Sequence, residues 1–346
     1  MWSAAEAREV LERAGLGGQA EANLAYLGIS EAGNFEGSNV LNIREGAWTP
    51  RPDGFEAARA ALLAARGERV RPGLDDKVLT SWNALMIAAL AESGAALAEP
   101  GFVAAATECA DFILERMRDG EGRLLRTFGR GEARLNAYLE DHAYLLEALL
   151  ALYEAGLEPR FYAAAREIAD TIIERFGDTE RGGFFTTSHD HERLVARRKD
   201  LDDHPIPSGN SSAALGLLRL GALSGERRYA EWGEGVLKLL AAPAERHPQA
   251  LSYALLALDF SLGPVHEVAL VVPAGAGVEE AGPMLRELRS RYRPRVVTAA
   301  GPEGADQPPL LAGRPALDGG PAAYVCEQFA CRTPVGSAEA LAAELG

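Results

Sequence analysis

Polar side chains cluster where the sequence predicts three successive apolar helices to begin. In the first cluster, residues 75–77 (Asp-Asp-Lys) are followed by residues 81–83 (Ser-Trp-Asn) and then by an apolar stretch. Residues 138–142 and 208–211 open the second and third helices. Carboxylates and histidine serve proton transfer in proteins, and amides and hydroxyls hold polar ligands. The three clusters therefore indicate a binding or catalytic site.

The clusters recur at roughly the length of two helices and their connections, which is typical of stacked helical hairpins. In such an array, equivalent helix ends collect on one side, where unsatisfied N–H groups favour hydroxyl-rich or anionic ligands. A structural alternative stays open, because Ser81, Asp141 and Ser208 are good N-cap residues. Each such cap contributes only about 1 kcal/mol of stability.

The predicted catalytic residues are His142, Glu140, Asp141 and Asp76. Sugar epimerisation or isomerisation needs a base that takes a proton beside a carbonyl and an acid that returns one, and a histidine beside carboxylates can supply both. Glycoside hydrolysis needs two carboxylates about 5 Å or about 6.5–9.5 Å apart, and Asp75 joins the candidates for that reaction. For the histidine, a surface ion pair with its acidic neighbours is the alternative.

An aromatic platform for a sugar ring is predicted at Trp82, with Phe35, Phe184 and Phe185 as further candidates. Amide side chains near the helix starts would bind hydroxyl groups. The alternative is that Trp82 belongs to the core and that the asparagines close loops. The predicted substrate-binding residues are Asn34, Phe35, Glu36, Asp75, Lys77, Trp82, Asn83, Tyr138, His204, Ser208 and Asn210.

We expect no metal ion and no cofactor. The two adjacent aspartates at 75 and 76 have no further metal ligands at a suitable spacing. The two histidines of the segment 189–191 (His-Asp-His) have no third metal ligand in view. The glycines at 275 and 277 lack the third glycine and the acidic residue of a dinucleotide site. Cys326 and Cys331 have the wrong spacing for a Cys-x-x-Cys pair, so we expect two buried structural thiols; a disulfide or a thiol relay is the alternative.

The hydrophobic pattern predicts paired helices followed by a small α/β region. The predicted pairs are 81–97 with 102–117, 139–155 with 161–176, and 211–224 with 228–240, followed by a single helix at 249–260. Short helices are expected at 3–13, 19–27 and 55–66, and short β segments at 40–43, 123–128, 182–187 and 194–197.

The composition changes at Gly263-Pro264. Beyond it we predict strands at 267–273, 295–298 and 322–326, and helices at 278–292 and 337–345. The expected domains are therefore a helical domain over 1–262 and a small α/β domain over 263–346.

Composition excludes several classes of protein. A net charge of −15 opposes binding to nucleic acid or to anionic lipid. The chain of 346 residues contains no uncharged apolar run long enough to span a membrane. Its N-terminus lacks the basic and apolar regions of a signal peptide, and its three cysteines are too few for a secreted disulfide scaffold, so we expect a cytoplasmic location.

Five motifs occur in order along the chain: Gly33-Asn34-Phe35-Glu36-Gly37, Leu74-Asp75-Asp76-Lys77-Val78-Leu79-Thr80-Ser81-Trp82-Asn83, Tyr138-Leu139-Glu140-Asp141, Pro207-Ser208-Gly209-Asn210-Ser211 and Tyr324-Val325-Cys326. With them the chain resembles the C-terminal portion of the thioredoxin-domain-containing proteins of the YyaL type, which include the spermatogenesis-associated protein 20 relatives. The resemblance implies a mainly α fold, an (α/α) toroid like that of six-hairpin glycosidases and N-acylglucosamine 2-epimerases.

The same resemblance implies that full-length relatives carry a thioredoxin-like domain ahead of this region, which this chain lacks. We therefore expect a shortened chain whose toroid is complete or incomplete. An incomplete toroid would leave an apolar seam for a thioredoxin-like partner or a second copy of the chain.

Two functions stay open at this point. The first is an enzyme that acts on a sugar or sugar derivative by epimerase, isomerase or glycosidase chemistry at the helix starts. The second is a non-catalytic scaffold that binds a sugar or docks a protein partner.

Overall fold

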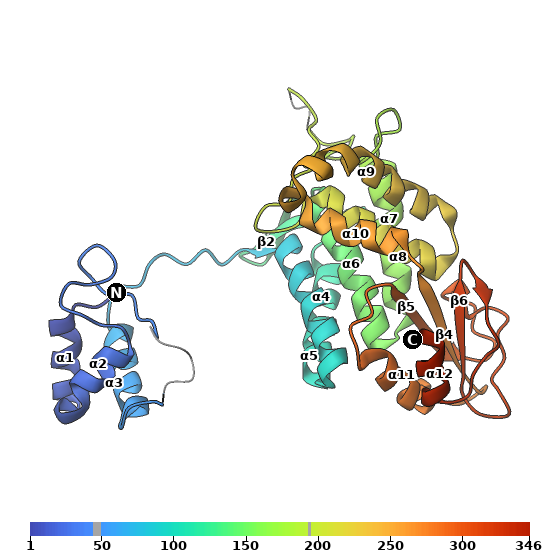
Figure 1. The fold of residues 1–346 in the computed structure, drawn as a ribbon. Coiled ribbons are helices and arrows are strands. Elements are labelled where there is room, and N and C mark those ends of the chain that lie inside the picture. Colours follow the sequence, from blue (N-terminus) through green and yellow to red (C-terminus); the bar gives the residue numbers. More distant parts are fainter. Residues whose placement is uncertain (44–49, 193–194) are drawn as a thin grey trace. The chain divides into compact units, whose positions relative to one another are not determined.

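The computed structural model describes residues 1–43, 50–192 and 195–346. The chain divides into two compact units, Met1–Asp75 and Asp76–Gly346, and each is described by itself. Figure 1 shows the helices and strands of both units.

The N-terminal unit consists of three helices, α1 (Ala4–Arg13), α2 (Ala20–Tyr26) and α3 (Phe55–Gly67). The Ser3 side chain caps α1 by accepting a hydrogen bond from the backbone N–H of Glu6 at 3.1 Å. Trp2, Leu11 and Leu24 are buried between these helices. Residues 40–43 form no strand, because the pairing stops at a single bridge between Trp2 and Asn39.

The second unit is built from helical hairpins. Its helices are α4 (Thr80–Leu97), α5 (Pro100–Arg116), α6 (Leu139–Gly156), α7 (Pro159–Phe176), α8 (Gly209–Ser224), α9 (Arg227–Arg246) and α10 (Ser252–Leu262). The inner helices lie in the order α4, α6, α8, α10, and α5, α7 and α9 each pack against the inner helix that precedes them (Figure 1). This alternation of inner and outer helices is of the (α/α) toroid type and confirms the expected mainly α fold.

The burial of the helices follows from their sequences. Nearly every side chain of α6 from Leu139 to Tyr153 is buried, which matches a helix that is apolar on all faces. Outer helix α7 buries one stripe, including Phe161, Ile168 and Ile172, and exposes its charged residues. Inner helix α6 and outer helix α7 therefore differ in their hydrophobic pattern.

A small antiparallel sheet lies beside the starts of α4 and α6. It contains β1 (Val78–Leu79), β2 (Leu125–Gly129) and β3 (Glu132–Asn136) in that order. The β segment predicted at 123–128 is therefore confirmed as β2. The segment predicted at 182–187 forms only one bridge, between Gly177 and Phe184, and the segment predicted at 194–197 begins outside the described residues.

The C-terminal region forms a four-stranded sheet of order β5-β4-β6-β7. Strands β4 (His266–Val272) and β5 (Val296–Pro302) are parallel, with α11 (Gly282–Arg289) between them in sequence; β6 (Ala322–Glu327) and β7 (Ala330–Cys331) run antiparallel, and α12 (Ala338–Leu345) ends the chain. The predicted strand–helix–strand unit is confirmed.

The boundary predicted near Leu262 falls inside the second unit. One face of the sheet has its own core with α11 and α12, which includes Leu270, Leu285 and Leu341. The other face, with Val271 and Val297, joins the core of the helical array. A division into 1–262 and 263–346 stays a prediction.

The prediction of two buried thiols is wrong, because Cys326 and Cys331 form a disulfide. A two-residue turn at Gln328-Phe329 joins β6 to β7 and sets the two cysteines opposite each other in the ladder. Cys326 is buried and Cys331 is exposed. In the part of the chain that the structure describes, no helix has both the length and the hydropathy needed to cross a membrane.

Candidate functional site

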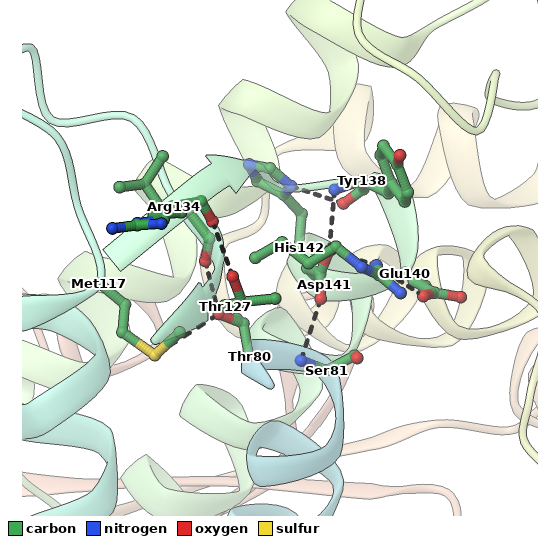
Figure 2. A network of polar contacts seen from close by, with 11 residues as sticks. Thr80, Ser81, Met117, Thr127, Arg134, Tyr138, Glu140, Asp141 and His142 are labelled. Atoms are coloured by element: carbon green, nitrogen blue, oxygen red, sulfur yellow. Dashed lines mark hydrogen bonds and ion pairs between the residues drawn. The ribbon is translucent and has the colours of Figure 1, made fainter. Parts of the chain in front are cut away.

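Asp141 joins the starts of α4 and α6. Its side chain is fully buried and accepts hydrogen bonds from the backbone N–H groups of Ser81 at 3.0 Å and Tyr138 at 2.9 Å (Figure 2). The Arg126 guanidinium donates to the same carboxylate at 2.9 Å. Burial raises the pKa of Asp141, and the Arg126 charge opposes that rise. Asp141 is therefore a helix-start residue that links two hairpins.

Arg126 also binds the second predicted carboxylate of this cluster. Its guanidinium lies 2.8 Å from Glu140 Oε1 and 4.7 Å from the centre of the Tyr138 ring. One cation is thus shared by Glu140 and Asp141. Arg126 was not predicted, because it reaches this position from strand β2 and only the pairing of that strand brings it here.

His142 faces away from these carboxylates. Its Nδ1 atom lies 2.8 Å from the Tyr138 carbonyl oxygen, and its ring packs on Phe176 of α7 with centroids 5.0 Å apart. Burial lowers the pKa of His142 to about 4, so the ring is neutral near pH 7. His142 lines a cavity of only about 180 Å³, which has room for a few water molecules.

The third helix start is also closed by hydrogen bonds. The Ser208 side chain caps α8 by accepting from the Ser211 N–H at 3.1 Å, and its own N–H donates to Asp203 at 2.8 Å. Asn210 is buried and holds the loop ahead of the helix through Phe184 N–H, Phe184 carbonyl and Asp200 carbonyl. Ser208 and Asn210 therefore serve as a cap and a loop closure, and a role in binding stays a prediction.

The remaining predicted residues of the second unit differ in their exposure. Trp82 is 63% exposed, and Asp76, Lys77 and His204 are also exposed. The Asn83 side chain donates to the carbonyl of Leu79, the residue before α4. Phe184 is not part of an aromatic platform, because it is buried and stacks on Trp232.

Four of the predicted binding residues belong to the N-terminal unit, namely Asn34, Phe35, Glu36 and Asp75. Asn34 closes a loop there through both polar groups of Val40. Their part in a common site stays a prediction. Within the described ranges, no group of three His, Cys, Asp or Glu side chains is placed to hold a metal ion.

A larger cavity lies on the inner side of the helical array, at residues that the sequence did not lead us to. It has a volume of about 940 Å³, and α4, α6, α8 and α10 contribute to its wall together with α11 and β5. We call it the inner cavity. Its polar lining includes Glu92, Glu147, Glu154, Arg219 and Tyr253.

Glu147 is the buried carboxyl group of the inner cavity. The Ser212 hydroxyl donates to its Oε1, and the Tyr253 hydroxyl donates to its Oε2 at 2.9 Å. Burial raises the pKa of Glu147 to about 7 in spite of these two donors. Burial also raises the pKa of Tyr253, which keeps the phenol protonated as a donor. A carboxyl group with a pKa near the working pH can both give and take a proton.

An ion-pair network lies further along the wall of the inner cavity than Glu147. Arg219 pairs with Glu154 at 2.7 Å and approaches Glu92 at 3.9 Å. Glu154 also accepts the Thr298 N–H at 3.3 Å, so strand β5 is tied to the inner helices. Hydroxyl groups of a ligand would find both donors and acceptors here.

A signal for these residues is present in the sequence. Glu147 stands alone among apolar residues 143–153, and Arg219 stands alone in a leucine-rich helix. A single charged residue inside an otherwise apolar helix marks a buried polar site, because its burial must be compensated. The polar clusters at the helix starts do not extend to the middle of α6 and α8, where Glu147 and Arg219 lie.

The fold and the inner cavity define the class of protein, a helical-hairpin array of the (α/α) toroid type. Among solved structures, the chain is similar to cellobiose 2-epimerase from Bacillus thermoamylovorans (TM-score 0.41, 11% identity, 47% of this chain and 44% of that one). It is also similar to an unsaturated glucuronyl hydrolase from Bacillus sp. GL1 (TM-score 0.40, 14% identity, 68% and 66%). Likenesses of this extent carry no argument about a reaction.

The chain is a homologue of spermatogenesis-associated protein 20, which confirms the resemblance seen in its motifs. It is 29% identical to the human protein over 97% of this chain and 48% of the human one, and 31% identical to the mouse protein over 90% and 44%. It spans about half the length of the curated relatives that it matches. No protein-family model matches the chain.

Proposed function

We propose that this chain binds a sugar or sugar derivative in the inner cavity and exchanges a proton with it through Glu147. The observation that carries the proposal is a buried carboxyl group whose pKa is raised to about 7 at the wall of a cavity of about 940 Å³. That volume suits a small organic ligand such as a mono- or disaccharide. His142, Glu140, Asp141 and Asp76 remain predictions as catalytic residues.

Two reactions use a group of this kind. In epimerisation or isomerisation, Glu147 would take a proton from the carbon beside a sugar carbonyl and return it. In hydrolysis, protonated Glu147 would donate to the glycosidic oxygen, and a second carboxylate would be needed. Glu92 and Asp259 also line the inner cavity and are the candidates for that second role. In both reactions Ser212 and Tyr253 stabilise the carboxylate that proton donation leaves behind.

Turnover of a panel of mono- and disaccharides in D2O tests the proposal. NMR would follow deuterium entering beside the carbonyl and the release of free monosaccharide. We expect one of these signals with the wild type and its loss in Glu147→Gln, with Glu140→Gln as the matched control at the helix starts. Activity lost in Glu140→Gln and kept in Glu147→Gln would return the chemistry to the helix starts.

A docking scaffold is the second candidate function, and the surface of α4 favours it. Trp82, Met86 and Leu97 are 63%, 57% and 66% exposed. Helix α4 is the edge of the inner layer in the second unit, and an exposed apolar strip of this kind is typical of a protein contact. Sedimentation velocity tests whether a second copy binds there. Association that is lost in Trp82→Ser would support the contact, and a monomer at all concentrations would exclude self-association.

A further inference from the structure

The disulfide in the C-terminal sheet joins a buried cysteine to an exposed one. Cys326 on β6 and Cys331 on β7 are direct partners in the antiparallel ladder. The two residues of the turn between them, Gln328 and Phe329, have positive φ angles of 51° and 62°. This is the geometry of a tight two-residue hairpin. Cys331 is exposed, so the pair is reachable from solvent on one side.

Arg314 lies against both sulfur atoms. Its Nη2 is 3.0 Å from Cys331 Sγ and 3.6 Å from Cys326 Sγ. Glu267 is buried opposite Cys326 in the ladder, and its charge acts on this guanidinium from beyond ion-pair distance. The buried Nε of Arg314 has no hydrogen-bond acceptor among the residues that the structure describes. A disulfide is neutral and compensates a partly buried cation poorly. A thiolate would compensate it well, since a nearby Arg stabilises the charged form of a cysteine.

We propose that Cys326 and Cys331 form a thiol–disulfide exchange site that accepts electrons from a dithiol reductant. A thiolate of the reductant attacks Cys331 Sγ, the bond to Cys326 breaks, and Cys326 leaves as a thiolate facing Arg314. The second thiol of the reductant loses its proton and attacks the mixed disulfide, which releases Cys331. Two electrons pass to the cysteine pair, and the reductant becomes a disulfide.

The hairpin has contacts that do not depend on the disulfide. The Phe329 N–H donates to Glu267 Oε2 at 2.7 Å, and Glu327 pairs with Ala330 in the ladder. Arg332 follows Cys331 in the sequence and binds Glu327 at 2.9 Å and Glu344 at 3.1 Å. Its guanidinium binds these carboxylates and not the sulfur atoms that Arg314 contacts. We therefore expect the fold to survive reduction, which a reversible exchange site requires.

The test uses the full chain with Cys109→Ser, so that the two exchanging cysteines are the only thiols. Dithiothreitol serves as the dithiol probe. Mass spectrometry after alkylation measures the reduced fraction, and circular dichroism checks that the protein stays folded. The rate of iodoacetamide alkylation of the reduced protein is then measured against pH in the wild type, Arg314→Gln and the matched control Arg332→Gln.

We expect reduction of the folded protein and reoxidation when dithiothreitol is removed. Alkylation near neutral pH should be about tenfold slower in Arg314→Gln, since a change of one pKa unit alters the thiolate fraction about tenfold. Arg332→Gln should match the wild type. A pair that reduces only when the protein unfolds, or equal rates with and without Arg314, would overturn the proposal. If Arg314→Gln does not fold, the pH profile of alkylation in the reduced wild type provides the test. A midpoint at the ordinary cysteine pKa of about 8.5 would also overturn the proposal.

Discussion

At the scale of single residues, Glu147 is distinguished from the other carboxylates by the way its charge is compensated. Asp141 is paired with Arg126 and two backbone N–H groups, whereas Glu147 accepts from two neutral hydroxyl donors and interacts with the Arg219 charge only at longer range. Hydroxyl donors stabilise a carboxylate less than an ion pair does. Glu147 therefore remains able to change its protonation state near neutral pH.

Replacing Glu147 should change how stability depends on pH. The folded-state pKa of about 7 lies above the ordinary value of 4.5, so the folded protein binds more protons than the unfolded chain between these values. The wild type should lose up to about 3 kcal/mol of unfolding free energy as pH rises through this window, and Glu147→Gln should not. Urea denaturation at pH 5 and pH 8 measures the difference. Glu92→Gln, in the same cavity, is the control for loss of a carboxylate.

His142 should have the opposite pH dependence. Its folded-state pKa of about 4 lies below the ordinary value of 6.5, so the unfolded chain binds more protons between these values. The wild type should lose up to about 3 kcal/mol of stability as pH falls from 6.5 to 4, and a His142→Gln variant should lack this component. The comparison is made by denaturation at both pH values, with exposed His204→Gln as the control. Parallel pH profiles for wild type and His142→Gln would contradict the buried, neutral ring.

At the scale of elements, the hairpins are connected through a few polar residues at the helix starts. Asp141 contacts the first turn of α4 and the residue before α6, and Asp203 accepts N–H groups from Ser208 before α8 and Tyr253 in α10. Such contacts satisfy the N–H groups that a helix leaves unpaired at its start.

Asp141→Ala should therefore destabilise the protein strongly. It leaves the partly buried Arg126 with Glu140 as its remaining carboxylate and leaves the backbone N–H groups of Ser81 and Tyr138 without their acceptor, at a cost of about 3 kcal/mol or more. Glu140→Ala removes a half-exposed partner of the same arginine and should cost under about 1 kcal/mol. Chemical denaturation of both variants gives the comparison. Equal costs would show that Asp141 does not join the hairpins as described.

Helices and strands could be predicted from the sequence because their patterns are local. The helix predicted at 81–97 is observed as Thr80–Leu97, and that predicted at 161–176 as Pro159–Phe176. Helix α9 was predicted too short, because it continues past Pro243 to Arg246. The candidate site could not be predicted in this way, because its residues are far apart in the sequence. Glu147 and Tyr253 are separated by 106 residues and meet only when α6 and α10 pack around α8.

At the scale of the whole molecule, the inner helices line the inner cavity together with α11 and strand β5 of the C-terminal sheet. Glu154 of α6 and Thr298 of β5 are hydrogen-bonded across that junction, and Arg289 of α11 donates to the last carbonyls of α6 at 2.8 Å. At the helix starts, Asp141, Ser208 and Asn210 are engaged in capping and loop contacts, and the binding site predicted there stays a prediction. A sugar site is therefore better supported in the inner cavity than at the helix starts. The cytoplasmic location stays a prediction from composition.

A thermal-shift measurement with mono- and disaccharides at millimolar concentration tests this claim most directly. It compares the wild type with Tyr253→Phe and Glu147→Gln in the inner cavity and with Trp82→Ala at the helix starts. We predict that a sugar raises the Tm of the wild type and of Trp82→Ala, and that the shift is reduced or lost in the two cavity variants. A shift lost in Trp82→Ala but retained in Glu147→Gln and Tyr253→Phe, or no shift with any sugar, would contradict a sugar site in the inner cavity.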